Sequence, residues 1–273
     1  MPLIHRITSL ELSELNPYRT LRRPQEHLDQ GIFVAEGEKV VRRLLASELP
    51  TISLLLTDEW LARISESHTK QLPPDIFVAE KQLLETIVGF RMHQGIMAVG
   101  RLPREPSLDD LVADSSMPRL FVALDGLVFA ENVGVVVRNC AAFGVQGILV
   151  GANSASPYLR RAVRNSMGTV FRIQVIHTPV LSETLMALHS THGMSIVVAD
   201  AHTGISLYEL DSRNDLCVVL GNEDAGASET VRSVASHAIS IPMKKGVDSL
   251  NVASASAVVL AEVARQRQTT SKK

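Results

Sequence analysis

The second half of the chain alternates short apolar runs with stretches of helical periodicity, and no other feature constrains the fold as strongly. Apolar runs of strand length stand at 119–124, 147–150 and 216–220, and each is followed by a stretch that suits a helix. Strands that alternate with helices favour a mostly parallel sheet with helices on both of its faces. We therefore predict an α/β fold for this half.

The expected elements divide the chain into two parts joined by a linker. Residues 103–118 are rich in proline, aspartate and serine, a composition typical of a domain boundary. In residues 1–102 we expect strands at 31–34, 51–57 and 95–99 and helices at 38–46 and 81–87. In residues 119–273 we also expect strands at 173–176, 195–199 and 238–241 and helices at 132–143, 158–165, 181–189, 228–235 and 250–265.

The composition is that of an ordinary globular protein. The hydrophobic fraction is 45%, the charged fraction is 21% and the net charge is −2, so the overall charge does not point to a nucleic-acid partner. Cys140 and Cys217 lie inside apolar runs, which favours buried thiols over metal ligands. No apolar run approaches the roughly 20 residues that span a bilayer, and the N-terminus does not resemble a signal peptide. We expect a cytoplasmic protein with no metal and no membrane contact.

Three polar segments of the second half stand where an expected strand ends or an expected helix begins. They cover residues 131–139, 221–226 and 241–251. Open α/β sheets bind ligands beyond the carboxyl ends of their strands. Three such segments in one chain indicate a single composite site.

The first segment places a charged residue in an apolar helix. Glu131 or Asn132 is expected to cap the start of this helix, and Gly134 permits the close approach of another backbone. Arg138 follows among valines and alanines, so its guanidinium needs a partner or a ligand. A structural salt bridge and a functional site explain Arg138 equally well at this point.

The other two segments carry residues that form loops and cap helices. In the second, glycines permit a tight turn against a ligand, and Glu223 can orient a neighbouring side chain. In the third, Ser249 is expected to cap the final helix, and Asn251 offers a donor and an acceptor in its first turn. Taken singly, a solvated acidic loop and a plain capped helix are the simpler interpretations.

A run of arginines without acids points to a polyanionic partner. Residues 132–182 contain no Asp or Glu, but they include Arg138, Arg160, Arg161, Arg164 and Arg172. Phosphate binding uses such a basic patch, whereas surface helices usually mix the two signs. A solvated helix face is the ordinary alternative for Arg160, Arg161 and Arg164.

The familiar phosphate-binding motifs are absent from the sequence. It has no GxxxxGK[ST] motif, and no GxGxxG motif follows the strand expected to end at Leu124. Nucleotide hydrolysis and the common mode of dinucleotide binding therefore lose their main support.

The three polar segments together resemble the motifs of the SpoU family of SPOUT RNA methyltransferases, in the same order and at the same spacing. Residues 33–37 and 94–99 are similar to the family's small substrate-binding domain, which is itself similar to ribosomal protein L30e. The resemblance implies an L30e-like RNA substrate-binding domain in residues 1–102 and a SPOUT methyltransferase domain in residues 119–273. It also implies methyl transfer from S-adenosylmethionine to a ribose 2′-hydroxyl in RNA, a homodimer, and a C-terminal trefoil knot.

The resemblance also implies a role for each residue that matches a family position. Cofactor binding is implied for Gly221, Asn222, Ile241, Met243 and Leu250, and RNA binding suits the arginines at 160, 161 and 164. Catalytic positions are matched by Arg138, Asn132, Glu223, Ser249 and Asn251. Because a guanidinium is very hard to deprotonate, Arg138 suits orienting the ribose hydroxyl or gripping a phosphate better than acting as a base.

Two other functions remain open from the sequence. One is a catalytically silent RNA-binding module with the same fold, and the other is an α/β enzyme for a small metabolite. For the RNA partner, the two-domain layout favours ribosomal RNA over transfer RNA.

Overall fold

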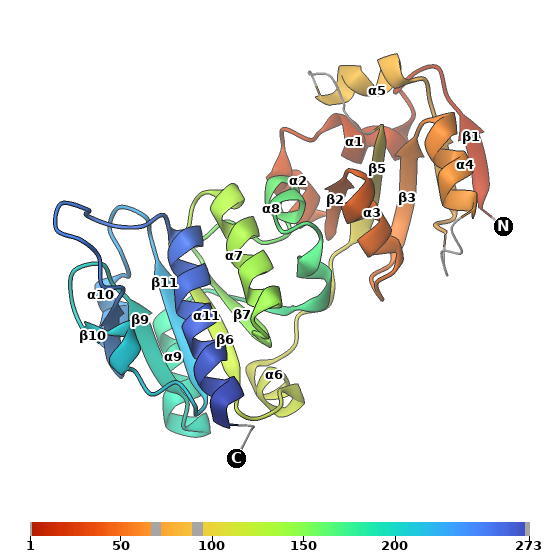
Figure 1. The fold of residues 1–273 in the computed structure, drawn as a ribbon. Helices are drawn as coiled ribbons and strands as arrows, with labels where there is room; N and C mark the ends of the chain where they lie inside the picture. Colours follow the sequence, from red (N-terminus) through yellow and green to blue (C-terminus); the bar gives the residue numbers. More distant parts are fainter. Residues whose placement is uncertain (1, 67–71, 89–94, 271–273) are drawn as a thin grey trace. The chain divides into compact units, whose positions relative to one another are not determined.

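The chain folds into two compact units in a computed structural model that describes residues 2–66, 72–88 and 95–270 (Figure 1). Unit 1 contains the chain up to Arg104 together with residues 158–171. Unit 2 contains residues 105–157 together with the chain from Arg172 onward. The sequence patterns place residues 158–171 in the second part, but in the fold they belong to unit 1.

Unit 1 is built around a mixed sheet with the strand order β1-β4-β3-β5-β2. The strands β1, β4 and β3 are parallel, and β5 runs antiparallel to both β3 and β2. The strands are β1 (Leu3–Arg6), β2 (Ile32–Glu36), β3 (Thr51–Leu56), β4 (Asp75–Val78) and β5 (Ile96–Arg101). The helices of its N-terminal part are α1 (Asn16–Arg19), α2 (Pro24–Asp29), α3 (Glu38–Leu45), α4 (Asp58–Glu66) and α5 (Lys81–Val88).

Residues 158–171 complete unit 1 by covering β2. They carry the short helix α8 (Arg160–Asn165), which packs against β2. The ring of Phe33 in β2 lies 5.7 Å from the ring of Tyr158 and 5.3 Å from that of Phe171, measured between centroids. All three aromatic residues are buried, so this segment closes a hydrophobic surface that the first hundred residues leave open.

Unit 2 has a sheet in which every recorded strand pair is parallel, with the order β10-β12-β9-β11-β6-β7-β8. The strands are β6 (Leu120–Asp125), β7 (Gly147–Gly151), β8 (Gln174–Thr178), β9 (Ser195–Ala199), β10 (Ile205–Ser206), β11 (Leu216–Gly221) and β12 (His237–Ser240). The central strands β6 and β11 are buried along nearly their whole length, as expected for apolar strands covered on both faces. The predicted α/β class with a mostly parallel sheet is confirmed.

Helices cover both faces of this sheet. Side chains of α6 (Leu108–Asp114), α9 (Leu181–His192) and α10 (Glu229–Arg232) share one core with β6, β7, β9 and β11. On the other face, α7 (Ala130–Ala142) and α11 (Val252–Thr270) pack side by side, and α11 also contacts β11 (Figure 1). Cys140 and Cys217 are buried, and burial raises the pKa of both thiols.

The segment expected to be a linker contains structure of its own. Helix α6 lies within residues 103–118, and its Leu111 and Val112 are buried in the core of unit 2. Ser107 caps this helix, because its hydroxyl accepts a hydrogen bond from the backbone N–H of Asp110 at 3.1 Å. The prolines of the segment therefore flank a short amphipathic helix, and its three aspartates lie within that helix.

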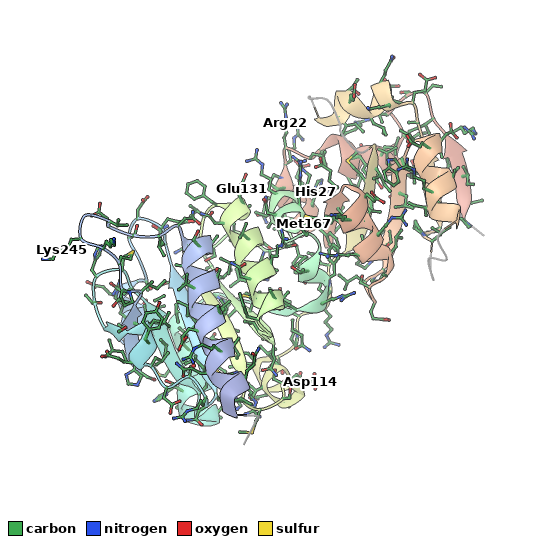
Figure 2. All side chains as sticks on the ribbon, viewed as in Figure 1. Arg22, His27, Asp114, Glu131, Met167 and Lys245 are labelled. Carbon is green, nitrogen blue, oxygen red and sulfur yellow. The ribbon has the colours of Figure 1, made fainter. Side chains whose placement is uncertain are left out.

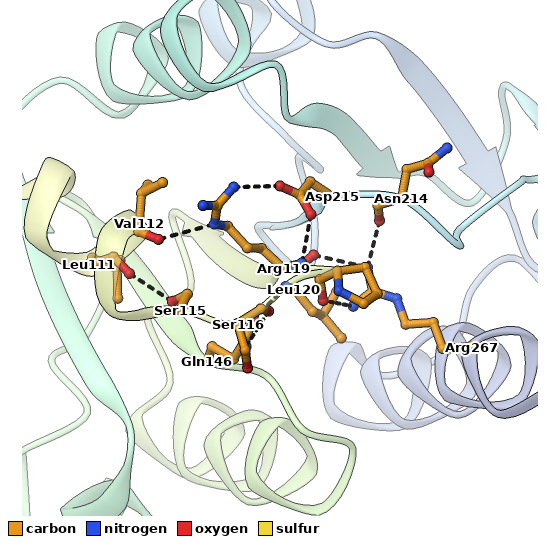
Figure 3. Close-up of polar contacts among 11 residues, drawn as sticks. Leu111, Val112, Ser115, Ser116, Arg119, Leu120, Gln146, Asn214, Asp215 and Arg267 are labelled. Atoms are coloured by element: carbon orange, nitrogen blue, oxygen red, sulfur yellow. Dashed lines mark hydrogen bonds and ion pairs between the residues drawn. The ribbon is translucent and has the colours of Figure 1, made fainter. Parts of the chain in front are cut away.

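The end of α11 is tied to the beginnings of two strands by one guanidinium (Figure 3). Arg267 donates to the carbonyl oxygens of Pro118 and Arg119, which precede β6, at 2.7 and 2.9 Å. It also donates to those of Ser212 and Asn214, which precede β11, at 3.0 and 2.7 Å. These four bonds, which we call the Arg267 clamp, hold the last turns of α11 at the end of the sheet where strands β6 and β11 begin.

Candidate active site

The carboxyl ends of the strands at the centre of the unit 2 sheet surround a cavity of about 400 Å³. Residues that end or follow β9, β11 and β12 line it, and the start of α11 closes it. The predicted site residues among its lining are Gly221, Asn222, Glu223, Ile241, Met243, Ser249 and Leu250. Two of the three polar segments thus meet at one cavity, which has the size of a small-molecule site.

The loop that follows β11, residues 222–227, contributes residues 222–226 to one wall of this cavity, and we call it the β11 loop. Asn222 and Gly226 exchange two backbone hydrogen bonds of 3.0 and 2.9 Å, which close the loop on itself. The Asn222 side-chain oxygen accepts from the N–H groups of Asp224 and Ala225, both at 3.0 Å. Its side-chain nitrogen donates to the Gly126 carbonyl at 2.8 Å, which anchors the loop to the end of β6.

Gly221 lacks room for any side chain. A Cβ atom at this position would lie 2.2 Å from the backbone nitrogen of Ala227 and 2.4 Å from the carbonyl carbon of Gly226. The far end of the β11 loop therefore lies directly on Gly221. Gly226 adopts a φ of +70°, which glycine tolerates better than any other residue.

Asn251, rather than Ser249, caps the final helix. Helix α11 begins at Val252, and the side-chain oxygen of Asn251 accepts from the backbone N–H of Ala253 at 2.9 Å. Ser249 stands two residues earlier, where it lines the cavity. The expectation that Ser249 caps this helix was wrong because the helix starts later than its apolar periodicity indicates.

A chain of hydrogen bonds joins the first segment to the other two. The Asn132 amide donates to Glu223 Oε1 at 2.7 Å, and the Asn251 amide donates to Asn132 Oδ1 at 3.3 Å. Helix α7 begins at Ala130, so Asn132 lies in its first turn and not at the predicted cap. The second carboxylate oxygen of Glu223 is buried without a hydrogen-bond partner among the described residues, which leaves it able to accept a bond from a ligand.

Arg138 stands apart from this chain of hydrogen bonds. It lies on α7 six residues after Asn132, about one and two-thirds turns, and therefore points to a different side of the helix. Arg138 is exposed, makes no hydrogen bond or ion pair with any described residue, and is not among the described residues that line the cavity. A structural salt bridge within the described chain therefore does not account for it.

Its neighbour Asn139 has a structural role instead. The Asn139 amide donates to the Ala253 carbonyl at 2.8 Å and to the Ser256 hydroxyl at 2.9 Å, which joins α7 to α11. Ser256 is fully buried, in line with the close helix packing that the small residues of 253–257 favour.

Several residues that line the cavity are not among the predicted site residues. Asp200, His202, Asp224, Arg232 and Asp248 are among them. Asp200 directly follows β9, so the rule that polar residues at strand ends mark a site would have found it. Burial raises the pKa of Asp200, but hydrogen bonds from the His202 N–H and the Arg232 guanidinium outweigh burial and hold that pKa below its usual value.

The lining of the cavity is rich in acids. Among the described lining residues, four carry carboxylates, namely Asp200, Glu223, Asp224 and Asp248, and Arg232 alone carries a permanent positive charge. The apolar part comes from Leu220, Ile241 and Leu250, together with valines of α11. Such a site suits a ligand with a positive charge and a flat apolar group.

The predicted RNA-binding arginines belong to unit 1, and two of them pair with an acid. Arg160 donates to Glu36, which lies at the end of β2, and Arg164 approaches the same carboxylate at 3.4 Å. Glu36 is 9% exposed and Arg160 17% exposed, so this pair is a largely buried contact within unit 1. The acid-free stretch of sequence gives no sign of this pair, because Glu36 stands 124 residues before Arg160 in the chain.

The other two arginines of α8 stay exposed. Arg161 lies on the surface of unit 1, and the side chain of Arg164 is 53% exposed. Nearby, Arg43 donates to the carbonyl of Met167 at 2.6 Å, and Figure 2 marks Met167 in this part of the unit. The side chains of Arg161 and Arg164 are therefore accessible to solvent.

The described part of the chain has neither a candidate membrane span nor a candidate metal site. None of its helices is long and apolar enough to cross a membrane. Its His, Cys, Asp and Glu side chains form no group of three or more that could hold a metal ion.

Comparison with known sequences shows similarity to RNA-modifying proteins. A model of the SpoU rRNA Methylase family matches residues 119–261. An uncharacterized tRNA/rRNA methyltransferase of Mycolicibacterium paratuberculosis is 34% identical over 90% of this chain and 81% of its own length. A protein of Mycobacterium tuberculosis with the same description is 33% identical over 90% of this chain and 78% of its own.

Solved structures share the fold of both units. An rRNA methyltransferase from Sinorhizobium meliloti, crystallised with AdoMet bound, has a TM-score of 0.83 and 22% identity, with 96% of this chain and 98% of its own covered. The SpoU methyltransferase AviRb from Streptomyces viridochromogenes, in complex with the cofactor AdoMet, has a TM-score of 0.81 and 22% identity, with 94% of this chain and all of its own covered.

Proposed function

The chain belongs to the SpoU rRNA Methylase family, and on that basis we propose that it transfers a methyl group to the 2′-hydroxyl of a ribose in RNA. Members of this family use S-adenosylmethionine as the methyl donor, and this chain is an RNA methyltransferase of that kind. The observation that carries the finer proposal is the chain of hydrogen bonds from Asn251 through Asn132 to Glu223, at the edge of the strand-end cavity.

The cavity fits S-adenosylmethionine in size and charge. Its volume of about 400 Å³ lies in the range of small-molecule sites. Its four carboxylates suit a ligand that carries a sulfonium and an ammonium group, and its leucines and isoleucines suit an adenine ring. When bound, the cofactor supplies an electrophilic methyl group. Gly221, Asn222, Ile241, Met243 and Leu250 are the residues that we propose hold it.

The polar residues of the first segment would meet the RNA. Asn132 is fixed on both sides, by Glu223 and by Asn251, so its amide is held in one orientation. Arg138, on the same helix, has an exposed guanidinium that pairs with no described residue. Because this group stays protonated at neutral pH, we propose that Arg138 grips a phosphate or orients the ribose hydroxyl, and does not remove its proton. Ser249 would complete this set from the lining of the cavity.

Replacing Arg138 tests this assignment. We expect Arg138→Ala to lower methyl transfer to RNA by about 100-fold or more, because positioning groups contribute on that scale. The affinity for S-adenosylmethionine should stay within about twofold in calorimetry, since Arg138 does not line the cavity. Arg213→Ala removes an exposed arginine of unit 2 that lies outside the acid-free stretch, and it serves as the matched control. Full activity of Arg138→Ala would exclude the role.

We further propose that the RNA is ribosomal. The support is the two-unit layout, which the Sinorhizobium meliloti rRNA methyltransferase shares over 96% of this chain. In this proposal unit 1 is the L30e-like substrate-binding domain, and Arg161 and Arg164 contact the RNA backbone. Mapping 2′-O-methyl groups in RNA from cells with and without the gene would identify the nucleotide, and a lost site in transfer RNA would overturn the proposal.

The family also supports three broader proposals. We propose a homodimer, a trefoil knot formed by the last strands and α11, and a cytoplasmic location. The family match speaks against a silent RNA-binding module, and calorimetry tests this directly, because such a module would not bind S-adenosylmethionine.

A further inference from the structure

One ion pair lines the cavity without belonging to any of the three polar segments. Asp200 directly follows β9, and Arg232 ends the short helix α10. Arg232 Nη1 donates to Asp200 Oδ2. The Asp200 side chain is 6% exposed and the Arg232 side chain 36% exposed, so the carboxylate depends on this guanidinium for its counter-charge.

Arg232 also holds the β11 loop. Its Nε donates to the Ala227 carbonyl at 2.9 Å. Its Nη2 lies so close to Gly226 that a Cβ atom there would be 2.8 Å away. The backbone at 226–227 rests in turn on Gly221. The Arg232 guanidinium, the β11 loop and the end of β11 therefore form one continuous stack.

Asp200 extends this stack to two more strands. Its Oδ1 accepts from the N–H groups of His202 and Thr203 at 2.8 and 2.9 Å. Its own N–H donates to the Ile239 carbonyl of β12 at 2.8 Å. Gly204, in the same turn, lies against β12, because a Cβ atom there would be 2.1 Å from the Ala238 oxygen. The ion pair therefore joins the loops that leave β9 and β11 to strand β12.

We propose that the Asp200–Arg232 pair is a positioning device that holds the β11 loop in the shape that receives S-adenosylmethionine. This inference rests on the proposed function. A loop that is already ordered loses little conformational entropy when a ligand binds, so the pair increases affinity for the cofactor. Neither residue needs to touch the reacting atoms, because Arg232 acts through the carbonyl of Ala227.

Calorimetry of S-adenosylmethionine binding tests the pair. We expect Arg232→Gln and Asp200→Asn each to weaken binding by about tenfold, because the loop must then be ordered at the expense of binding free energy. The double variant should bind about as weakly as either single variant, since the two residues act as one unit. Arg213→Gln breaks an exposed ion pair with Asp211 away from the cavity and should change binding by less than about twofold.

Steady-state kinetics separates positioning from general damage. In Arg232→Gln the KM for S-adenosylmethionine should rise by about tenfold, while kcat at saturating cofactor stays within about threefold of the unmodified protein. Arg232→Lys keeps the charge opposite Asp200 but cannot also donate to Ala227. Its KM for S-adenosylmethionine should therefore lie between that of the unmodified protein and that of Arg232→Gln. This variant and Asp200→Asn decide the matter if Arg232→Gln does not fold.

The possible failures are distinguishable. If the unmodified protein does not bind S-adenosylmethionine, the proposed function is wrong. If it binds, and the folded Arg232 and Asp200 variants bind within twofold of it, the positioning role is wrong. A loss of kcat at an unchanged KM would also overturn that role, because it would place the pair in the chemical step.

Discussion

At the scale of single residues, backbone contacts shape the cavity as much as side chains do. Gly221 is the clearest example, because the nitrogen of Ala227 occupies the space that any Cβ atom would need. The motif that contains Gly221 was visible in the sequence. The contact that makes this glycine necessary was not, since it depends on how the β11 loop folds back.

Gly221→Ala should therefore abolish the cofactor site while leaving a folded protein. The added methyl group must push the backbone at 226–227 away, and we expect the affinity for S-adenosylmethionine to fall by at least about 30-fold, an effect of about 2 kcal/mol. Gly147→Ala is the matched control, since its Cβ would meet only the Leu111 side chain at 2.8 Å, outside the cavity. Calorimetry and thermal melting of both variants give the measurement, and equal affinities would contradict the argument.

At the scale of elements, periodicity located the long strands and helices and missed the short ones. The strands β6, β7, β9 and β11 stand where apolar runs predict them, because strands buried on both faces need such runs. Strands β1, β4 and β10 and helices α1, α2, α4 and α6 were not predicted. Each is short or carries few apolar residues, so the local pattern is weak, and contacts with the rest of the unit decide its structure.

The C-terminal helix shows how one element depends on a distant anchor. Removing the four hydrogen bonds of Arg267 in Arg267→Ala should lower the free energy of unfolding by about 2–3 kcal/mol, the usual scale for charge-assisted bonds to partly buried carbonyls. Urea unfolding followed by circular dichroism measures the loss. Arg213→Ala, which removes an exposed arginine of the same unit, should leave the unfolding midpoint nearly unchanged. Equal midpoints for the two variants would show that the clamp is not stabilising.

At the scale of the whole molecule, the chain does not divide at a single point. Residues 158–171 leave unit 2 between β7 and β8 and complete unit 1, where Phe33 packs against Tyr158 and Phe171. Composition located a boundary near the linker, because prolines and acids are a local signal. Composition could not show that the chain returns to unit 1 at residues 158–171. That return depends on the packing of aromatic rings that are far apart in the chain.

Glu36→Gln tests how much the ion pair between Glu36 and Arg160 contributes to holding residues 158–171 in unit 1. The change leaves the largely buried Arg160 without its carboxylate, and we expect unit 1 to lose about 2–3 kcal/mol of stability. Hydrogen exchange should then rise in residues 158–171, as mass spectrometry can measure. Glu48→Gln, an exposed position in the same unit, is the control. Unchanged exchange in 158–171 would mean that the aromatic contacts alone hold the segment.

The sequence by itself determined the α/β class, the family and seven of the residues that line the cavity, because strand periodicity and motif order are local properties of a chain. Only the tertiary structure decided which of those residues meet. It joined Asn132 to Glu223, paired Arg160 with Glu36, and placed Asp200 and Arg232 beside the β11 loop. Partners that are tens of residues apart come together through strand order and packing, and no local pattern encodes them.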